Sequence, residues 1–267
     1  MEFDLSKIKL SNSDIKRNLK FPQELTTEIA ELIGIILGDG NIYLKENKQY
    51  ELSIYGHMTE DKDHHLKITK LIKKLFNIQT YETKNISFNC IRTRISSKGI
   101  LYFITKSLKL NSGDKRKYIK IPKYILNNKE ITASFLRGLF DTDFTLVFKK
   151  RGSKKRHDYP TIRGKFNNKE FVKQLNQIIK GLDFKTNMYY EPKYDKKKNK
   201  IYHGYAIELN GKYNLEKWMN LISINNLKHL TKYKIWKKYG FCPPHTNLSE
   251  RQNILNKRLD PNIFYKN

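Results

Sequence analysis

Apolar residues recur along this chain of 267 residues with two spacings, one typical of helices and one typical of strands. In the first half, Thr26 or Thr27, Asp61 and Ser97 stand where helices are expected to begin. Helical spacing predicts helices over 26–38, 61–76 and 99–108. Strand-like segments separate them at 41–45, 50–56, 79–83 and 86–95, with a turn at 84–85. The predicted order is helix, two strands, helix, two strands, helix.

The same order is predicted again in the second half. A helix capped by Thr132 and ending near Asp143 comes first, and Asn167 or Asn168 begins the next one. The predicted elements are helices over 132–143, 170–181 and 213–222 and strands over 145–149, 159–166, 184–192 and 201–209. The pattern therefore predicts an α+β fold of two pseudo-symmetric αββαββα units in one chain.

The boundaries of the expected parts follow from composition. Residues 1–112 are expected to form the first unit with a polar lead-in, and 131–240 the second unit. A basic linker with Gly113 and Pro122 is expected over 113–130, and a tail that contains Pro243 and Pro244 over 241–267.

Charge narrows the partner. Lys and Arg number 53 against 26 Asp and Glu, a net charge of +27, which favours binding to nucleic acid through phosphate contacts. A basic soluble or ribosomal-type protein is the alternative. A membrane partner is not expected, because no segment is apolar enough to span a bilayer or reads as a basic amphipathic anchor.

The two cysteines and the start of the chain bear on location. Cys90 and Cys242 are too few for a disulfide framework, which fits a reducing compartment. The N-terminal residues lack a secretory pattern, so the protein is not expected to be secreted. A cytoplasmic location in a prokaryote or archaeon is expected, or an organellar matrix or stroma if an organelle encodes the chain.

Two short segments resemble one another. Leu32–Gly40 and Leu136–Phe144 each have a glycine at the third place and an aspartate at the eighth, with apolar residues between. Gly34 and Gly138 are small enough to let two helices approach closely, which would bring Asp39 and Asp143 together at the helix ends.

Such a pair of carboxylates suits a divalent cation. Two negative side chains would lie at the negative ends of two helices, beside the last helical carbonyls, those of Gly38 and Thr142. Oxygen donors of this kind suit Mg²⁺, with Mn²⁺ as a substitute, and a bridging cation can activate water and bind a phosphodiester. The alternative is two buried helices that end in ordinary polar residues. Two motifs at unit spacing in a chain of this charge favour the metal site.

The paired segments resemble the motif of the LAGLIDADG homing endonucleases in their monomeric form. Leu32–Gly40 matches the pattern at Leu, Gly, Asp and the final Gly, whereas Phe144 replaces the final Gly of the second copy. The resemblance implies two packed motif helices and one four-stranded antiparallel sheet per unit, together forming a DNA-binding saddle. It also implies that Asp39 and Asp143 bind the metal ions. Asp141, at the inner acidic place, is a poorer ligand candidate and is expected to act as a cap.

The resemblance further implies one basic residue per unit near the metals. The candidates in the first unit are Lys115, Arg116, Lys117 and Lys120, and in the second Lys228, Lys232 and Lys234. We predict catalytic roles for Lys117 and Lys228. The alternative for each lysine is a solvated or phosphate-contacting charge. His57, near the end of a predicted strand, is a weaker candidate for a water-binding side chain.

Alternate residues on the predicted strands are expected to face DNA, because successive side chains of a strand point to opposite faces and a two-stranded ribbon fits the major groove. Arg92 and Arg94 share a face and are the best candidates for reading bases, with plain backbone contact as the alternative. The other expected contacts are Tyr43, Lys45, Arg163, Lys165, Tyr189 and Glu191 on strands and Lys154, Lys155 and Lys197 in basic loops.

The sequence therefore predicts a monomeric, metal-dependent, site-specific DNA endonuclease of the intron or intein homing type. It would cut both strands of a long, pseudo-palindromic duplex and leave 3′ overhangs. Two alternatives stay open at this point: an RNA maturase that assists splicing of a group I intron, and a non-catalytic DNA-binding protein of the same fold.

Overall fold

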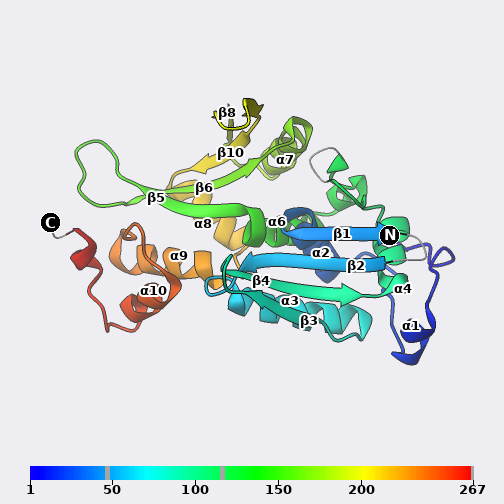
Figure 1. Cartoon of the computed structure of the whole chain (residues 1–267). Coiled ribbons are helices and arrows are strands. Elements are labelled where there is room, and N and C mark those ends of the chain that lie inside the picture. The colour runs from blue at the N-terminus through cyan, green and yellow to red at the C-terminus, as the bar shows by residue number, and fades with distance from the viewer. Residues whose placement is uncertain (46–48, 115–117, 266–267) are drawn as a thin grey trace. The chain divides into compact units, whose positions relative to one another are not determined.

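The computed structural model describes residues 1–45, 49–114 and 118–265 (Figure 1). Its α-helices are α1 (Asn12–Lys16), α2 (Thr27–Gly38), α3 (Lys62–Phe76), α4 (Lys98–Tyr102), α6 (Lys129–Asp143), α7 (Lys169–Gly181), α8 (Lys212–Leu221), α9 (Leu227–Tyr239) and α10 (Leu248–Leu255). A π-helix, η1 (Phe103–Ser107), continues α4, and two 3₁₀ helices are η2 (Lys123–Asn127) and η3 (Pro261–Tyr265). The strands are β1 (Gly40–Lys45), β2 (Gln49–His57), β3 (Tyr81–Asn85), β4 (Cys90–Ser96), β5 (Phe144–Lys149), β6 (Tyr159–Phe166), β7 (Asn187–Tyr190), β8 (Lys193–Asp195), β9 (Lys200–Tyr202) and β10 (Tyr205–Asn210).

The first sheet has four antiparallel strands in the order β1-β2-β4-β3. Its side chains alternate between two faces, as the strand geometry requires. One face is apolar and buried, and it includes Ile42, Leu52, Ile54, Ile91 and Ile95. The opposite face is polar, so one side of this sheet belongs to the core and the other is available for binding.

The second sheet repeats this plan with four antiparallel strands in the order β5-β6-β10-β7. Phe144, Leu146, Ile162 and Leu209 on its apolar face are buried, and the ring of Phe144 lies 6.2 Å from that of the buried Trp218 in α8. Strands β8 and β9 form a separate two-stranded ribbon between β7 and β10. The predicted α+β fold with two αββαββα repeats and two four-stranded antiparallel sheets is confirmed.

The chain divides into two compact units. One comprises Met1–Met58 and Lys62–Thr142, and the other comprises Thr59–Asp61 and Asp143–Asn267. The loop between β2 and α3 thus packs with the second unit although both of its flanking elements belong to the first. Both motif helices, apart from the last residue of α6, lie in the first unit.

Several predicted element boundaries are wrong. α6 begins at Lys129, so Thr132 is not a cap but a buried helical residue whose hydroxyl donates to the carbonyls of Ile125 and Asn128. The side-chain oxygen of Asn128 instead accepts hydrogen bonds from the first helical N–H groups. The turn of the second hairpin lies at 86–89 rather than 84–85, and a predicted helix over 99–108 changes into a π-helix after Tyr102.

Other local predictions are confirmed. Thr26 caps α2, Ser97 caps α4 and Asn168 caps α7, and in each case the side-chain oxygen accepts a backbone N–H from the first turn. These caps satisfy donors that a helix start leaves without an intrahelical partner. The segment 241–267 differs from the expected tail, because it contains the helices α10 and η3 in addition to its prolines.

Candidate metal centre and nucleic-acid interface

Gly34 and Gly138 bring the backbones of α2 and α6 into direct contact. A methyl group added to Gly34 would meet the carbonyl oxygen of Phe135 and lie 2.7 Å from the backbone nitrogen of Leu139. A methyl group on Gly138 would meet the carbonyl oxygen of Glu31. Each glycine therefore occupies a place where the neighbouring backbone leaves no room for a side chain. The close approach predicted from the paired motifs is present between these two helices.

An ion pair also joins the motif helices. Arg137 of α6 donates from Nη2 to the Oε2 of Glu31 in α2 at 2.7 Å, and from Nε at 3.1 Å. Both side chains are largely buried, at 24% and 16% exposure. A two-point contact of this kind fixes the relative rotation of the helices as well as their distance. The pair therefore holds the register of α2 against α6.

Each motif helix ends at one of the predicted metal ligands. Asp39 caps α2, with its N–H donating to the carbonyl of Ile35 and its own carbonyl accepting from the N–H of Tyr55 at 3.1 Å. Asp143 is the last residue of α6, and both aspartates are partly exposed. The neighbouring Thr142 turns its hydroxyl inward, to the carbonyls of Gly138 and Leu139. Asp141, by contrast, is 2% exposed.

The donor set at the helix ends fits a hard cation. Carboxylates at the negative ends of helices are oxygen donors in an electrostatic environment that a divalent cation stabilises. Within the described part of the chain, no group of three or more His, Cys, Asp and Glu side chains is placed to hold a metal. The two aspartates and the carbonyls of Gly38 and Thr142 stay the expected donors, and their convergence stays a prediction.

Of the two predicted catalytic lysines, Lys117 lies outside the described residues. Lys228 lies in the first turn of α9, with its Nζ 3.5 Å from the Oδ2 of Asp61 and its side chain 32% exposed. Asp61 also accepts a hydrogen bond from the side chain of Asn226 at 2.8 Å. A carboxylate thus already accompanies Lys228.

Lys232, one turn further along α9, has the most perturbed environment of the alternatives. Its Nζ donates to the carbonyl of Leu146 at 3.2 Å. Burial, with the nearby charge of Arg251 as a further cause, lowers the pKa of Lys232 to about 8. A lysine in that range can exchange a proton near neutral pH, which an ordinary surface lysine does poorly. The sequence offered Lys232 only as an alternative to Lys228, because burial cannot be read from its position.

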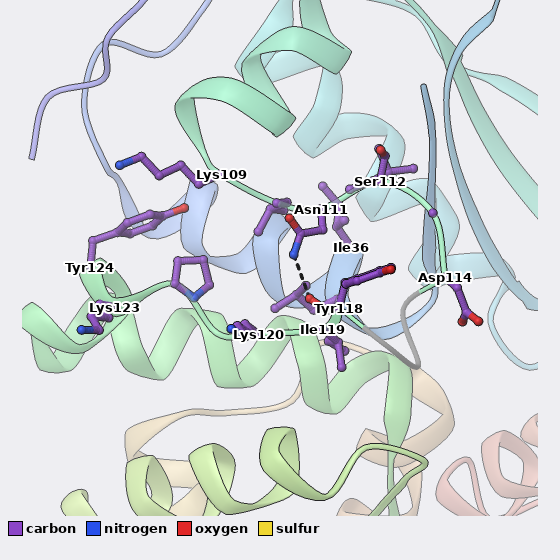
Figure 2. Close-up of a pocket in the computed structure, with 15 residues that line it drawn as sticks. Ile36, Lys109, Asn111, Ser112, Asp114, Tyr118, Ile119, Lys120, Lys123 and Tyr124 are labelled. Atoms are coloured by element: carbon purple, nitrogen blue, oxygen red, sulfur yellow. Dashed lines mark hydrogen bonds between the residues drawn. The ribbon is translucent and has the colours of Figure 1, made fainter. Parts of the chain in front are cut away.

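Lys120 lines a cavity of about 330 Å³ in the first unit (Figure 2). Ile36 and Leu37 of α2 and Ile42 of β1 form part of its wall, and residues of segments 109–114 and 118–124 form the rest. Tyr124 stands at this cavity with its hydroxyl donating to the carbonyl of Leu108, and burial raises the pKa of Tyr124 well above its ordinary value. Among the described residues, Lys120 is thus the basic candidate of the first unit, and it lines the same cavity as Ile36 and Leu37 near the end of α2.

The predicted DNA contacts of the first sheet share one face. Tyr43 is opposite Glu51 in the β1–β2 ladder, and the β2–β4 ladder places Ser53 opposite Arg94 and Tyr55 opposite Arg92. Because directly opposite residues in an antiparallel pair point to the same side, these side chains line the polar face together with Lys45. Arg92 and Arg94 also lie over the rings of Tyr55 and Tyr81, at 5.6 and 5.9 Å.

The predicted contacts of the second sheet likewise share a face. Arg163 is opposite Glu208, and Lys165 is opposite Ala206, which is in turn opposite Tyr189. In the loops, Lys155 and Lys197 are exposed, while Lys154 pairs with Asp158. The structure therefore groups the strand residues as predicted, and their contact with DNA stays a prediction.

The comparison with protein families bears on the second half of the chain. A family model described as "LAGLIDADG-like domain" matches residues 130–232. Residues 130–232 therefore form a LAGLIDADG-like domain. The matched segment begins in α6, covers the whole β5-β6-β10-β7 sheet and ends in α9. The resemblance predicted from the two motifs is thereby confirmed.

Curated relatives of this chain are much longer proteins. It is 28% identical over 237 residues to a DNA polymerase of Methanocaldococcus jannaschii, and this match covers 79% of the chain and 13% of the relative. It is 31% identical over 132 residues to a DNA polymerase of Thermococcus hydrothermalis, and this match covers 47% of the chain and 7% of the relative. The chain thus spans a small part of each.

Solved structures with a similar chain path include variants of the homing endonuclease I-DmoI, at 20% identity and a TM-score of 0.49, over 75% of this chain and 97% of that one. Another is the homing endonuclease I-WcaI bound to its DNA recognition sequence, at 24% identity and a TM-score of 0.49, over 80% and 88% of the two chains. No helix among the described residues has the length and apolar character of a membrane span.

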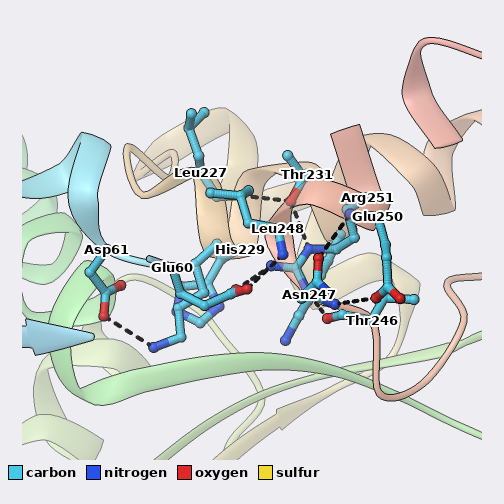
Figure 3. A network of polar contacts seen from close by, with 12 residues as sticks. Glu60, Asp61, Leu227, His229, Thr231, Thr246, Asn247, Leu248, Glu250 and Arg251 are labelled. Atoms are coloured by element: carbon cyan, nitrogen blue, oxygen red, sulfur yellow. Dashed lines mark hydrogen bonds and ion pairs between the residues drawn. The ribbon is translucent and has the colours of Figure 1, made fainter. Parts of the chain in front are cut away.

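Two features of the structure could not be predicted from the sequence. One is a buried network in which Arg251, 1% exposed, donates to Thr231, to the carbonyl of Thr246 and to Glu60 (Figure 3). The other is the pair of buried glutamates, Glu51 and Glu208, on the polar faces of the sheets. An alternation of polar residues along a strand signals such a face, but it does not tell which charges pair across it.

Proposed function

We propose that this LAGLIDADG protein is a site-specific endonuclease that hydrolyses both strands of a DNA duplex with divalent metal ions. The observation that carries the proposal is the glycine contact between α2 and α6, because it pairs two helices that each end in an aspartate. The polar faces of the two sheets, with arginine and lysine on each, supply the surface for the duplex.

The chemistry assigned to the residues is as follows. Asp39 and Asp143, with the carbonyls of Gly38 and Thr142, would hold Mg²⁺ or Mn²⁺. When bound, such an ion lowers the pKa of a water and stabilises charge on the phosphodiester. Lys228 and Lys232 would face the charge that develops on the second strand, with Asp61 restraining the ammonium of Lys228. Lys117 or Lys120 would serve the first strand.

The length of the relatives supports a homing role. The chain aligns over most of its own length with a small part of a DNA polymerase, as expected for an element inserted within a host gene. We therefore propose an intein- or intron-type homing endonuclease that acts as a monomer, since one chain contains both motifs. Its target would be a long, imperfectly palindromic duplex, cut to leave 3′ overhangs.

A library of plasmids with randomised inserts, incubated with the protein and Mg²⁺, tests the proposal. We expect linear plasmid from a small set of related inserts, and we expect Asp39→Asn and Asp143→Asn to abolish cutting while retaining binding. Asp183→Asn is the matched control, because it removes an exposed carboxylate that lies outside the motif helices. Within the described residues, Asp183 forms an ion pair with Lys217. Binding without cutting by the wild type would point to a non-catalytic DNA-binding protein. Binding to structured RNA alone would point to a maturase.

A further inference from the structure

The ladders of the two sheets can be placed in register with one another. Gly40 follows Asp39 and is opposite Ile54, just as Phe144 follows Asp143 and is opposite Gly164. Counting along the strands from these pairs makes Ser53 equivalent to Arg163. The pairing of the second and third strands then makes Arg94 equivalent to Glu208. The two polar faces therefore share one geometry but carry different charges at the same positions.

On the first sheet, one glutamate lies between two arginines. Glu51, 8% exposed, forms an ion pair with Arg92, and its other carboxylate oxygen is 3.7 Å from Arg94. Ser53 completes the arrangement: its hydroxyl donates to Glu51 at 2.7 Å and accepts from the Nε of Arg92 at 2.9 Å. With Tyr55 under its guanidinium, Arg92 is held from three sides.

On the second sheet, one arginine lies between two glutamates. Arg163 donates from Nη1 to Glu208 and from Nη2 to both oxygens of Glu191. Lys149 is 3.3 Å from Glu208, and Lys165 is 3.1 Å from Glu191. Burial raises the pKa of Glu208, but Arg163 and Lys149 outweigh it and keep that pKa below its ordinary value. Glu208 therefore stays charged although it is buried, with only 4% exposure.

The two held arginines occupy non-equivalent positions. Arg92 lies on β4, where the equivalent residue of the second sheet is Ala206, and Arg163 lies on β6, where the equivalent residue of the first sheet is Ser53. Their guanidinium-bearing side chains keep 29% and 27% exposure, so each still presents donors to the polar face. Anything read by these two side chains is read at a different place on each sheet.

A carboxylate on a DNA-facing surface has two opposing effects. It repels phosphate and lowers affinity for all sequences, since binding to any duplex depends on uncompensated positive charge. It also fixes the direction of a guanidinium, whose planar fork matches the two acceptors of guanine in the major groove. A glutamate that is buried between basic side chains and holds an arginine therefore favours selectivity at the expense of general affinity.

We propose that Glu51 and Glu208 are specificity-positioning residues, which orient Arg92 and Arg163 as guanine readers at non-equivalent places of the two half-sites. The inference rests on the proposed function, because it requires that the polar faces bind duplex DNA. It adds which residues read bases, which base they read, and why the two half-sites differ.

The test uses the full-length protein, the target selected from the plasmid library and a panel of single-base variants of that target. Binding is measured with Ca²⁺ in place of Mg²⁺ to prevent cutting. We expect Glu51→Gln to bind unrelated duplex more tightly than the wild type does. It should also lose roughly 5- to 150-fold discrimination for guanine at one position, the range for one bidentate contact. Glu208→Gln should do the same at a position in the other half-site that is not the mirror image of the first.

Glu82→Gln is the matched control, because Glu82 belongs to the same sheet but points to its opposite face and pairs with Lys84. It should leave the base preferences unchanged. Weaker binding of Glu51→Gln to every duplex, with unchanged base preferences, would overturn the inference and leave a structural role for these pairs. A wild type that binds no duplex would overturn the proposed function as well, so the two failures are distinguishable.

Discussion

Replacing Gly138 by alanine adds one methyl group at the point where α6 contacts α2. The new carbon would meet the carbonyl oxygen of Glu31 and lie 3.1 Å from the backbone nitrogen of Ile35. Both obstacles are backbone atoms within a helix, so no side-chain rotation relieves the contact. The helices would have to separate, which strains the packing around Leu136 and Leu139, both fully buried.

The expected magnitude combines two opposing effects. Overpacking a tight site costs typically about 1–3 kcal/mol. Alanine returns up to about 1 kcal/mol, because glycine is the poorer helix former. Because the added carbon meets backbone that cannot rotate away, the cost falls in the upper part of that range, about 2–3 kcal/mol, and we expect a net loss of about 1–2 kcal/mol in the free energy of unfolding. For a chain of this size that corresponds to a fall in Tm of roughly 2–8 °C.

Urea unfolding followed by circular dichroism measures this loss directly. Gly181→Ala is the control, because this glycine ends α7 and a methyl group there meets nothing within 4 Å. We expect Gly181→Ala to be neutral or slightly stabilising. If Gly138→Ala were as stable as Gly181→Ala, the backbone contact between the motif helices would be refuted, and with it the pairing of their ends.

Three further predictions follow from the charged groups. Arg251→Met should lower the free energy of unfolding by about 3–5 kcal/mol in urea titrations, because it removes the buried guanidinium that pairs with Glu60, and Glu60→Gln should also be destabilising, because it leaves that guanidinium buried without its carboxylate. Because the pKa of Lys232 falls to about 8 on folding, the folded state loses a proton before the unfolded state does, so stability should rise with pH from 8 to 9. Above 9, burial of Cys242 opposes this rise by raising the pKa of its thiol to about 12, and Lys232→Met should flatten the profile below 9. DNA affinity should fall about a thousandfold or more between roughly 50 and 200 mM salt, and a flat response in filter binding would contradict an extended phosphate interface.

Much of the fold could be predicted from local pattern. The alternation at 91–95 and the helical spacing at 170–181 each indicated an element with one apolar face that must be buried. The caps Thr26, Ser97 and Asn168 marked helix starts through their side-chain chemistry. The start of α6 was missed because Asn128 and Thr132 are both acceptable caps. Only the chain path through η2 decides which of them is buried.

The site was predictable in part. Two glycines in matching motifs indicated a close helix contact, and alternation indicated which strand residues share a face. The lowered pKa of Lys232 depends on burial and on Arg251, which approaches from α10 in a segment predicted as a tail. The glutamates that hold Arg92 and Arg163 depend on strand register, which is set by the whole sheet.

The position of a bound ion tests the central claim most directly. Crystals of the protein with its selected target, grown with Mn²⁺ and a duplex that resists cutting, would locate the metal by anomalous scattering. We predict a peak within coordination distance of carboxylate oxygens from both Asp39 and Asp143. A peak held by other residues, or by one aspartate with the second turned away, would contradict the claim that these two helix ends build the metal centre.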